Sequence, residues 1–177
     1  MLMTQATALA ASLLIAAAPS LPDCGTANAN CPRVDFGTCG NACCSIDLAL
    51  PSTVPESTAK ALEQALRAGG PDGQFSLPPL EGGKTGFTDL RPYKVKADFI
   101  GQAVHTTAKR GYRDTVNIAI APNKQGSTVR AFSVSNIGGA LGDSGQNYRN
   151  IQLIKQAATG VGEAQQVQER IIFGCGD

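Results

Sequence analysis

The spacing of apolar and polar residues changes along the chain, and each spacing predicts one kind of element. Between residues 54 and 66 the small and apolar positions recur every three or four residues, which is typical of an amphipathic helix. These positions are Val54, Thr58, Ala61, Leu62, Ala65 and Leu66. Thr53 and Glu56 have the spacing of a capping box, and Gly69 and Gly70 follow the last apolar position. We therefore expect a helix from about residue 53 to residue 68.

From residue 93 onward the spacing shortens to two, as in half-buried strands. The first predicted strand begins at Tyr93 and continues to about Ala108, with a bulge near Gly101, where the alternation breaks. The second and third cover residues 116–120 and 129–137. The connections between them are short, so the three strands should form an antiparallel meander.

A second helical pattern occupies residues 147–158, and residues 167–173 predict a last strand. Residues 21–52 are rich in Gly, Asn, Pro and Cys and show no periodicity, so we expect an irregular segment there. The order of elements predicts an α+β fold. It would be a two-layer sandwich in which two helices cover one face of an antiparallel sheet of about four strands.

The first twenty residues contain no charged side chain, and residues 8–18 are largely apolar. A run this short cannot cross a bilayer as a helix, which needs about 20 residues. It is typical of a secretory signal peptide, with cleavage expected after Ser20; a buried N-terminal helix is the alternative. The predicted organisation is a signal peptide at 1–20, a cysteine-rich irregular segment at 21–52 and an α+β domain at 53–177. We expect the protein to be secreted, or alternatively to reside in a plastid thylakoid lumen.

Six cysteines fall into two groups, five near the N-terminus and one near the C-terminus. They are Cys24, Cys31, Cys39, Cys43, Cys44 and Cys175. An even number in an exported chain predicts disulfides, whose connectivity the sequence leaves open. If all six pair, Cys175 must bond to one of the other five and close a loop of about 130 residues, which contributes about 5 kcal/mol. The adjacent Cys43 and Cys44 should bond to different partners. Zinc is disfavoured, because the chain has one His and no C-x-x-C spacing.

The charges nearly cancel, with 15 Lys and Arg against 14 Asp and Glu. This balance argues against nucleic acid as the main partner and against a polybasic membrane anchor. Five basic residues lie within or directly after the first predicted strand and should gather on one hairpin. There they would bind an anionic polysaccharide or the acidic face of a partner, or simply form a solvated sheet face. They are Lys94, Lys96, Lys109, Arg110 and Arg113.

The motif Asp143-x-Gly145-x-Asn147-x-Arg149-x-Ile151 follows a predicted strand and a Gly-rich loop. In this arrangement the chain resembles the DUF1499 family, over roughly residues 50 to 160. Where family members often carry arginine at the end of the third strand, this chain has Ser133, Ser135 and Asn136. The resemblance implies a fold, but because the family has no known function it implies no activity, cofactor or metal.

Polar residues in two loops are the candidates for a ligand-binding site, namely Asp89, Arg91, Asp143, Asn147 and Arg149. The plainer interpretation of the second loop is helix capping by Asp143, Ser144 or Asn147, with Gly145 at a positive φ. His105, the one histidine, should be an exposed residue on a strand and not a catalytic group.

No catalytic set converges in this sequence, so the leading hypothesis is a non-catalytic domain that binds another protein or a small anionic or lipidic ligand, without a cofactor. The first alternative is an enzyme with its site between the 82–91 and 138–149 loops. The second is an accessory protein of the thylakoid lumen.

Overall fold

The computed structural model describes residues 41–79, 83, 85–159 and 167–175. The predicted signal peptide, its cleavage site, and Cys24, Cys31 and Cys39 lie outside the described residues. The elements in chain order are β1 (Cys43–Pro51), α1 (Pro55–Arg67), β2 (Phe75–Ser76), β3 (Phe87–Asp89), the 3-10 turn η2 (Arg91–Tyr93), β4 (Phe99–Thr106), β5 (Arg113–Asn123), β6 (Gly126–Ser135), α2 (Gln146–Thr159) and β7 (Gln168–Gly174).

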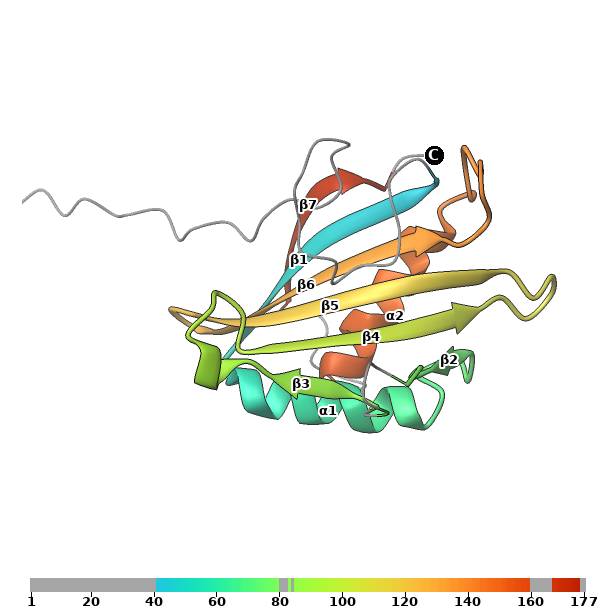
Figure 1. The fold of residues 1–177 in the computed structure, drawn as a ribbon. Coiled ribbons are helices and arrows are strands. Elements are labelled where there is room, and N and C mark those ends of the chain that lie inside the picture. The colour runs from blue at the N-terminus through green and yellow to red at the C-terminus, as the bar shows by residue number, and fades with distance from the viewer. Residues whose placement is uncertain (1–40, 80–82, 84, 160–166, 176–177) are drawn as a thin grey trace, which may run out of the picture.

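The described strands form one seven-stranded sheet in the order β2-β4-β5-β6-β1-β7, with β3 also paired to β4. Every pairing is antiparallel. The helices α1 and α2 lie together against one side of this sheet (Figure 1). The expected fold of about four strands in a two-layer α+β sandwich is therefore wrong: the molecule is mostly sheet, because three more strands join the predicted four.

The largest difference is β1, which lies inside the segment expected to be irregular. Ile46, Leu48 and Leu50 alternate with polar or small residues and are almost fully buried on the face toward the helices. β1 pairs with β6 over its whole length and with β7 on its other side. From Cys43 onward, the expectation of an irregular segment is wrong, and this strand belongs to the centre of the fold.

The core lies between the sheet and the helices and is aliphatic. Helix α1 buries Thr58, Ala59, Leu62 and Leu66, and α2 buries Ile151, Ile154 and Ala158. The helix bounds agree with the spacing in the sequence, but the predicted capping box is wrong. Val54 is the N-cap of α1 without a side-chain hydrogen bond, and the Thr53 hydroxyl donates to the Pro51 carbonyl instead.

The first predicted strand begins later than its alternation suggests. Tyr93 and Val95 are exposed, and β4 starts at Phe99. Gly101 does not mark a bulge, because it stays in register with both Phe87 of β3 and Ile118 of β5. A Cβ at Gly101 would lie 2.8 Å from the Phe87 ring, so glycine is needed there for close packing.

The disulfide between Cys44 and Cys175 confirms that the C-terminal cysteine bonds to the N-terminal group. It fixes the edge strand β7 to its neighbour β1 across a separation of 131 residues. Cys43 is also disulfide-bonded, so the two adjacent cysteines have different partners, as expected. Among the described residues, no helix has the length and apolar character needed to cross a membrane.

Candidate functional site

The loop before α2 is held by Asp143, which caps the helix. Its carboxylate accepts hydrogen bonds from the backbone N–H of Gly145 at 2.9 Å and of Asn147 at 2.6 Å. Gly145 has a φ of +78°. The interpretation of the Asp-x-Gly-x-Asn motif as a capping structure is confirmed, since both its acceptor and its positive φ are present.

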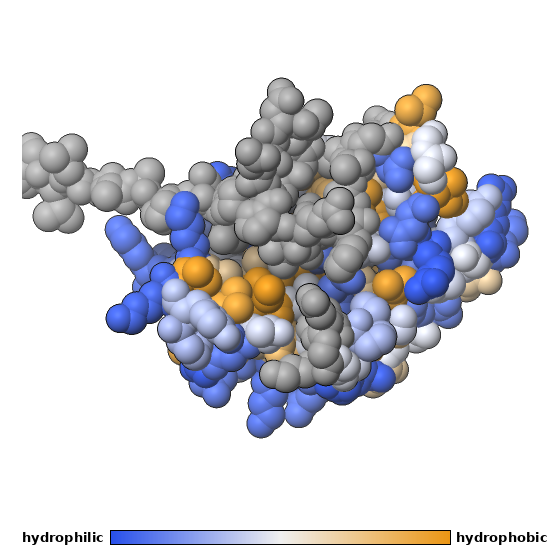
Figure 2. Space-filling view, in the orientation of Figure 1, coloured by the Kyte–Doolittle hydropathy of each residue, from blue (hydrophilic) through white to orange (hydrophobic). Residues whose placement is uncertain are grey.

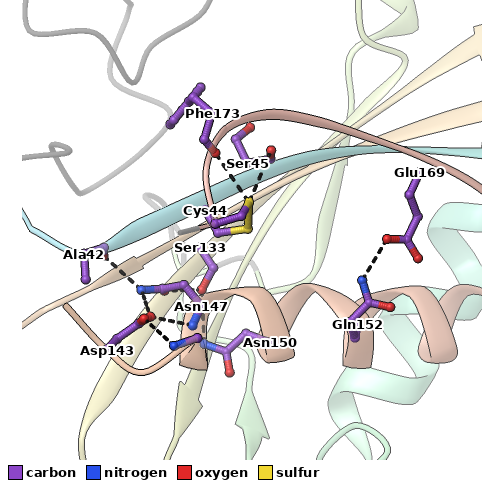
Figure 3. The surroundings of a disulfide bond; sticks show 12 residues. Ala42, Cys44, Ser45, Ser133, Asp143, Asn147, Asn150, Gln152, Glu169 and Phe173 are labelled. Atoms are coloured by element: carbon purple, nitrogen blue, oxygen red, sulfur yellow. Dashed lines mark hydrogen bonds between the residues drawn. A yellow bond between two sulfur atoms is a disulfide. The ribbon is translucent and has the colours of Figure 1, made fainter. Parts of the chain in front are cut away.

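Asn147 connects this cap to the sheet. Its side chain is almost completely buried, and its amide nitrogen donates to the Ala42 carbonyl just before β1. Its amide oxygen accepts from the Ser133 hydroxyl of β6 at 2.6 Å. Figure 3 shows Asp143, Asn147 and Ser133 directed toward one another beside the disulfide of Cys44. The motif thus positions the start of α2 against two strands.

The polar chain continues one turn along α2 at Asn150, which is fully buried. Its amide nitrogen donates to the Ser133 hydroxyl and to the Asp114 carboxylate of β5, at 3.1 and 2.9 Å. Its oxygen accepts from the side chain of Gln146. Each of these buried groups therefore has a partner within the protein, as buried polar atoms require.

Asp114 is the buried acid of this network. Burial raises its pKa above the ordinary value, and the nearby charge of Asp143 acts in the same direction. Hydrogen bonds from Asn150 and Ser135 and the proximity of His105 only partly oppose that effect. Because burial disfavours the ionised form, this carboxyl releases its proton less readily than an exposed one.

His105 lies across the β4–β5 pairing from Asp114 and is only 3 % exposed, so the expectation of an exposed strand histidine is wrong. Its Nε2 atom is 2.9 Å from the Asp72 carboxylate, and its ring packs edge-on against Phe75. The Nδ1 atom is buried without a hydrogen-bond partner. A substrate group cannot reach Nδ1 in this conformation, so the His–Asp pair supports packing here and not proton transfer to a ligand.

The residues expected to form one ligand-binding site fall into two separate places. Asp89 pairs with Phe99 at the start of β4, whereas Asn147 contacts Ser133 near the other end of the sheet. Following the register, the two places are four residues apart along the strands and three strands apart across them, or about 13 Å by 14 Å. Residues 80–82 and 84 of the first loop lie outside the described part of the chain.

Asp89 and Arg91 form an exposed ion pair at 2.6 Å, and Arg91 also contacts Glu56 of α1. The hydrogen bonds from Arg91 lower the pKa of Asp89, and the same pairing raises the pKa of Arg91. Arg91 is thereby engaged with two carboxylates. No group of three or more metal-binding side chains occurs within the described ranges.

A different set of exposed residues gathers where α2 begins, at a region we call the loop end. It comprises the β4–β5 turn (107–112) with the first residue of β5, Arg113, the loop after β6 (136–143) and the first turn of α2. Its basic residues are Lys109, Arg110, Arg113 and Arg149. Its exposed apolar and aromatic residues are Tyr112, Ile137, Leu141 and Tyr148.

Within the described residues, none of the ion pairs includes a basic residue of the loop end. Arg110 stacks over the Tyr112 ring at 5.8 Å. By contrast, Lys94 and Lys96 precede β4 and lie at the opposite end of that strand from Lys109. The expectation that all five basic residues share one hairpin is therefore wrong, and Arg149 of α2 joins the other three instead.

On the opposite face of the sheet, Asp47 of β1 accepts from two arginines. Arg130 of β6 donates at 2.6 Å and Arg170 of β7 at 2.7 Å. Burial alone would raise the pKa of Asp47, but the hydrogen bonds and charges of both arginines lower it overall. This cluster links three neighbouring strands, so its role is to stabilise the sheet.

Comparisons with known proteins add little to these observations. No family model matches the chain, and no curated protein matches it. Among solved structures, protein CV1439 from Chromobacterium violaceum, from a structural genomics programme, shares 15% identity, with 67% of this chain and 97% of that chain covered. The TM-score is 0.34, which is too low for the likeness to support an argument.

Proposed function

We propose that this protein is a non-catalytic, exported binding domain that attaches to a negatively charged partner through its loop end. The observation that carries the proposal is the grouping of four basic side chains on the neighbouring segments of the loop end, none of them ion-paired within the described residues. Elsewhere, Arg67, Arg91, Arg130, Lys155 and Arg170 each form a salt bridge. Unpaired charges of one sign on one surface attract a partner of the opposite sign.

The acidic groups near the loop end cancel only part of this charge. Asp143 is turned toward the backbone of α2, Asp114 is buried, and Asp72 is bonded to His105. The net balance of the whole chain, close to zero, therefore hides a local positive excess. This is why the charge balance of the whole chain argued against nucleic acid and against a polybasic membrane anchor.

The non-catalytic part of the proposal rests on where the polar side chains point. Asp143, Ser133 and Asn147 are hydrogen-bonded to one another or to the backbone, and Asn150 is joined to them. A catalytic site needs a group that a substrate can reach with a free donor or acceptor. In this protein the same groups fix the loop end to the sheet.

Export and membership of DUF1499 are further parts of the proposal. Export is supported by the pattern of residues 1–20 and by the Cys44–Cys175 disulfide, since such bonds persist in oxidising compartments. The family is supported by the motif from Asp143 to Ile151, whose first residues cap α2. Secretion and a thylakoid lumen both satisfy the first requirement.

Retention on immobilised dextran sulfate tests the binding function. The variant K109E/R110E reverses two charges at the loop end, and K60E/K124E reverses two exposed charges elsewhere as a matched control. We expect the first variant to elute at clearly lower salt than the wild type and the control to elute nearly with it. Equal shifts for both variants would contradict the proposal. Turnover of a substrate that His105→Ala abolishes in a folded protein would contradict its non-catalytic part.

A further inference from the structure

We propose that the partner of the loop end is the surface of an anionic lipid bilayer. This inference rests on the proposed function and goes further by naming the partner. It is carried by the exposure of large apolar side chains among the unpaired cations. Leu141 is 96 % exposed, and Ile137, Tyr112 and Tyr148 are each at least 38 % exposed.

Hydrogen bonds hold the three segments of the loop end side by side. The Asn136 N–H donates to the Arg113 carbonyl, which joins the β4–β5 turn to the loop after β6. That loop is attached to the chain before β1, where the Ala42 N–H donates to the Ala140 carbonyl. Asn147 of α2 donates to the Ala42 carbonyl in turn. The three segments that carry the apolar and basic residues therefore lie next to one another.

The space-filling view shows the same mixture. At the right-hand end, where Figure 1 places the β4–β5 turn and the loop after β6, hydrophobic and hydrophilic atoms lie next to one another (Figure 2). An isolated exposed leucine is ordinary on a protein surface. Four large apolar side chains beside four cations are less common, and they are half of the eight exposed large hydrophobic residues in the described part of the chain.

The chemistry of a bilayer surface fits both components at once. Anionic headgroups attract lysine and arginine, while leucine and isoleucine enter the boundary between headgroups and acyl chains. Tyrosine is favoured at the same depth because its ring is apolar and its hydroxyl is polar. A soluble polysaccharide would satisfy the charges alone and leave Leu141 in water.

The buried network gives this surface a fixed shape. Asp143 and Asn147 attach the start of α2 to β1 and β6, and Ser133 and Asn150 complete the connection. The loops consequently need not be ordered again when they meet a membrane, which lowers the entropic cost of binding. The residues that cap α2 therefore also hold the loop end in place.

The test is a vesicle sedimentation assay with the purified, oxidised chain. The vesicles contain either phosphatidylglycerol mixed with phosphatidylcholine or phosphatidylcholine alone. We expect binding to the first and not to the second, and weakening as salt is added. Each basic residue near an anionic surface raises the membrane partition coefficient roughly fivefold. K109E/R110E should therefore lower that coefficient at least about 25-fold. L141S should lower it about tenfold, because a leucine no longer leaves water.

The control variant K60E/K124E should bind the vesicles nearly as the wild type does. Three results would overturn the inference: equal binding to phosphatidylcholine alone, an equal loss in the control variant, or no effect of L141S. Retention on dextran sulfate separates a failure of the bilayer inference from a failure of the proposed function. If charge-dependent retention on the polymer remains while vesicle binding is absent, the bilayer is the wrong partner and the proposed function stands. If retention fails as well, both are wrong.

Discussion

The disulfide between Cys44 and Cys175 should account for a large part of the stability of this domain. We would remove it with the double substitution Cys44→Ala/Cys175→Ala, which leaves no unpaired thiol from this pair. The bond joins residues 131 positions apart. In the chain-entropy model, a loop of that size costs the unfolded chain about 17 cal/mol/K, or about 5 kcal/mol at room temperature.

Measured effects of native disulfides are about 2–5 kcal/mol, and small domains have about 5–15 kcal/mol in total. We therefore expect the variant to lose about 3–5 kcal/mol, which is a large fraction of a total of about 5–15 kcal/mol. Cys44 is fully buried, so part of that loss will come from core packing as well as from the chain.

Urea unfolding followed by circular dichroism measures this effect. The midpoint should fall, and the slope m should rise, because the unfolded chain without the cross-link exposes more surface. The difference in stability between the single variant Cys44→Ala and the wild type, both measured in reductant, gives the packing contribution by itself. A loss below about 1 kcal/mol for the double variant, with m unchanged, would refute the reasoning, since the long loop would then not constrain the unfolded state.

Three substitutions test other parts of the structure. Gly101→Ala should destabilise the domain by about 1–3 kcal/mol in urea titrations, because the new methyl group meets the Phe87 ring; wild-type stability would contradict the packing described here. Burial raises the folded-state pKa of Asp114 above 3.8, so the stability linked to its protonated form is lost as the pH rises through that raised pKa. Asp114→Asn should remove this decrease in a series of unfolding curves, and parallel pH profiles would count against it. Asp47→Ala should cost about 3 kcal/mol at neutral pH, because the partly buried Arg130 loses its carboxylate. Since the pKa of Asp47 is lowered, the difference from wild type should shrink as the pH falls through that folded-state pKa, whereas a difference independent of pH would exclude the pairing as its cause.

Local sequence patterns predicted those elements that depend on interactions between residues close together in the chain. The strands β5 and β6 alternate clearly and are joined by a short turn, and α2 has a sustained helical spacing. The strand β1 was missed although Ile46, Leu48 and Leu50 alternate. Its two partners come from β6 and β7, about 85 and 125 residues away along the chain, and no local turn signal points to such pairing.

No sequence pattern could predict the two shortest strands. β2 has two residues and β3 has three, which is too few to show a period. They form because Phe75 and Phe87 can pack beside β4. The expected sheet of about four strands was therefore too small at the β4 edge, where β2 and β3 pair, and in its interior, where β1 lies between β6 and β7.

The candidate site was predictable where one residue acts on its neighbours. Asp143 and Gly145 form the expected cap, because capping depends only on the adjacent backbone. Burial of His105 and Asn150 depends on elements far away in the chain, so the sequence alone suggested an exposed histidine. One signal was available for Asn150: it follows Asn147 by three residues and precedes Ile154 by four, which places all three on one helix face.

Backbone NMR during titration with bicelles that contain phosphatidylglycerol tests the central claim most directly. We predict that the amide resonances of residues 109–113 and 137–142 and of the first turn of α2 will shift and broaden first. The resonances of Lys60 and of the β5–β6 turn, at Lys124 and Gln125, should remain sharp. Changes spread evenly over the domain, or centred on the β5–β6 turn, would contradict the claim that the loop end is the surface that meets the membrane.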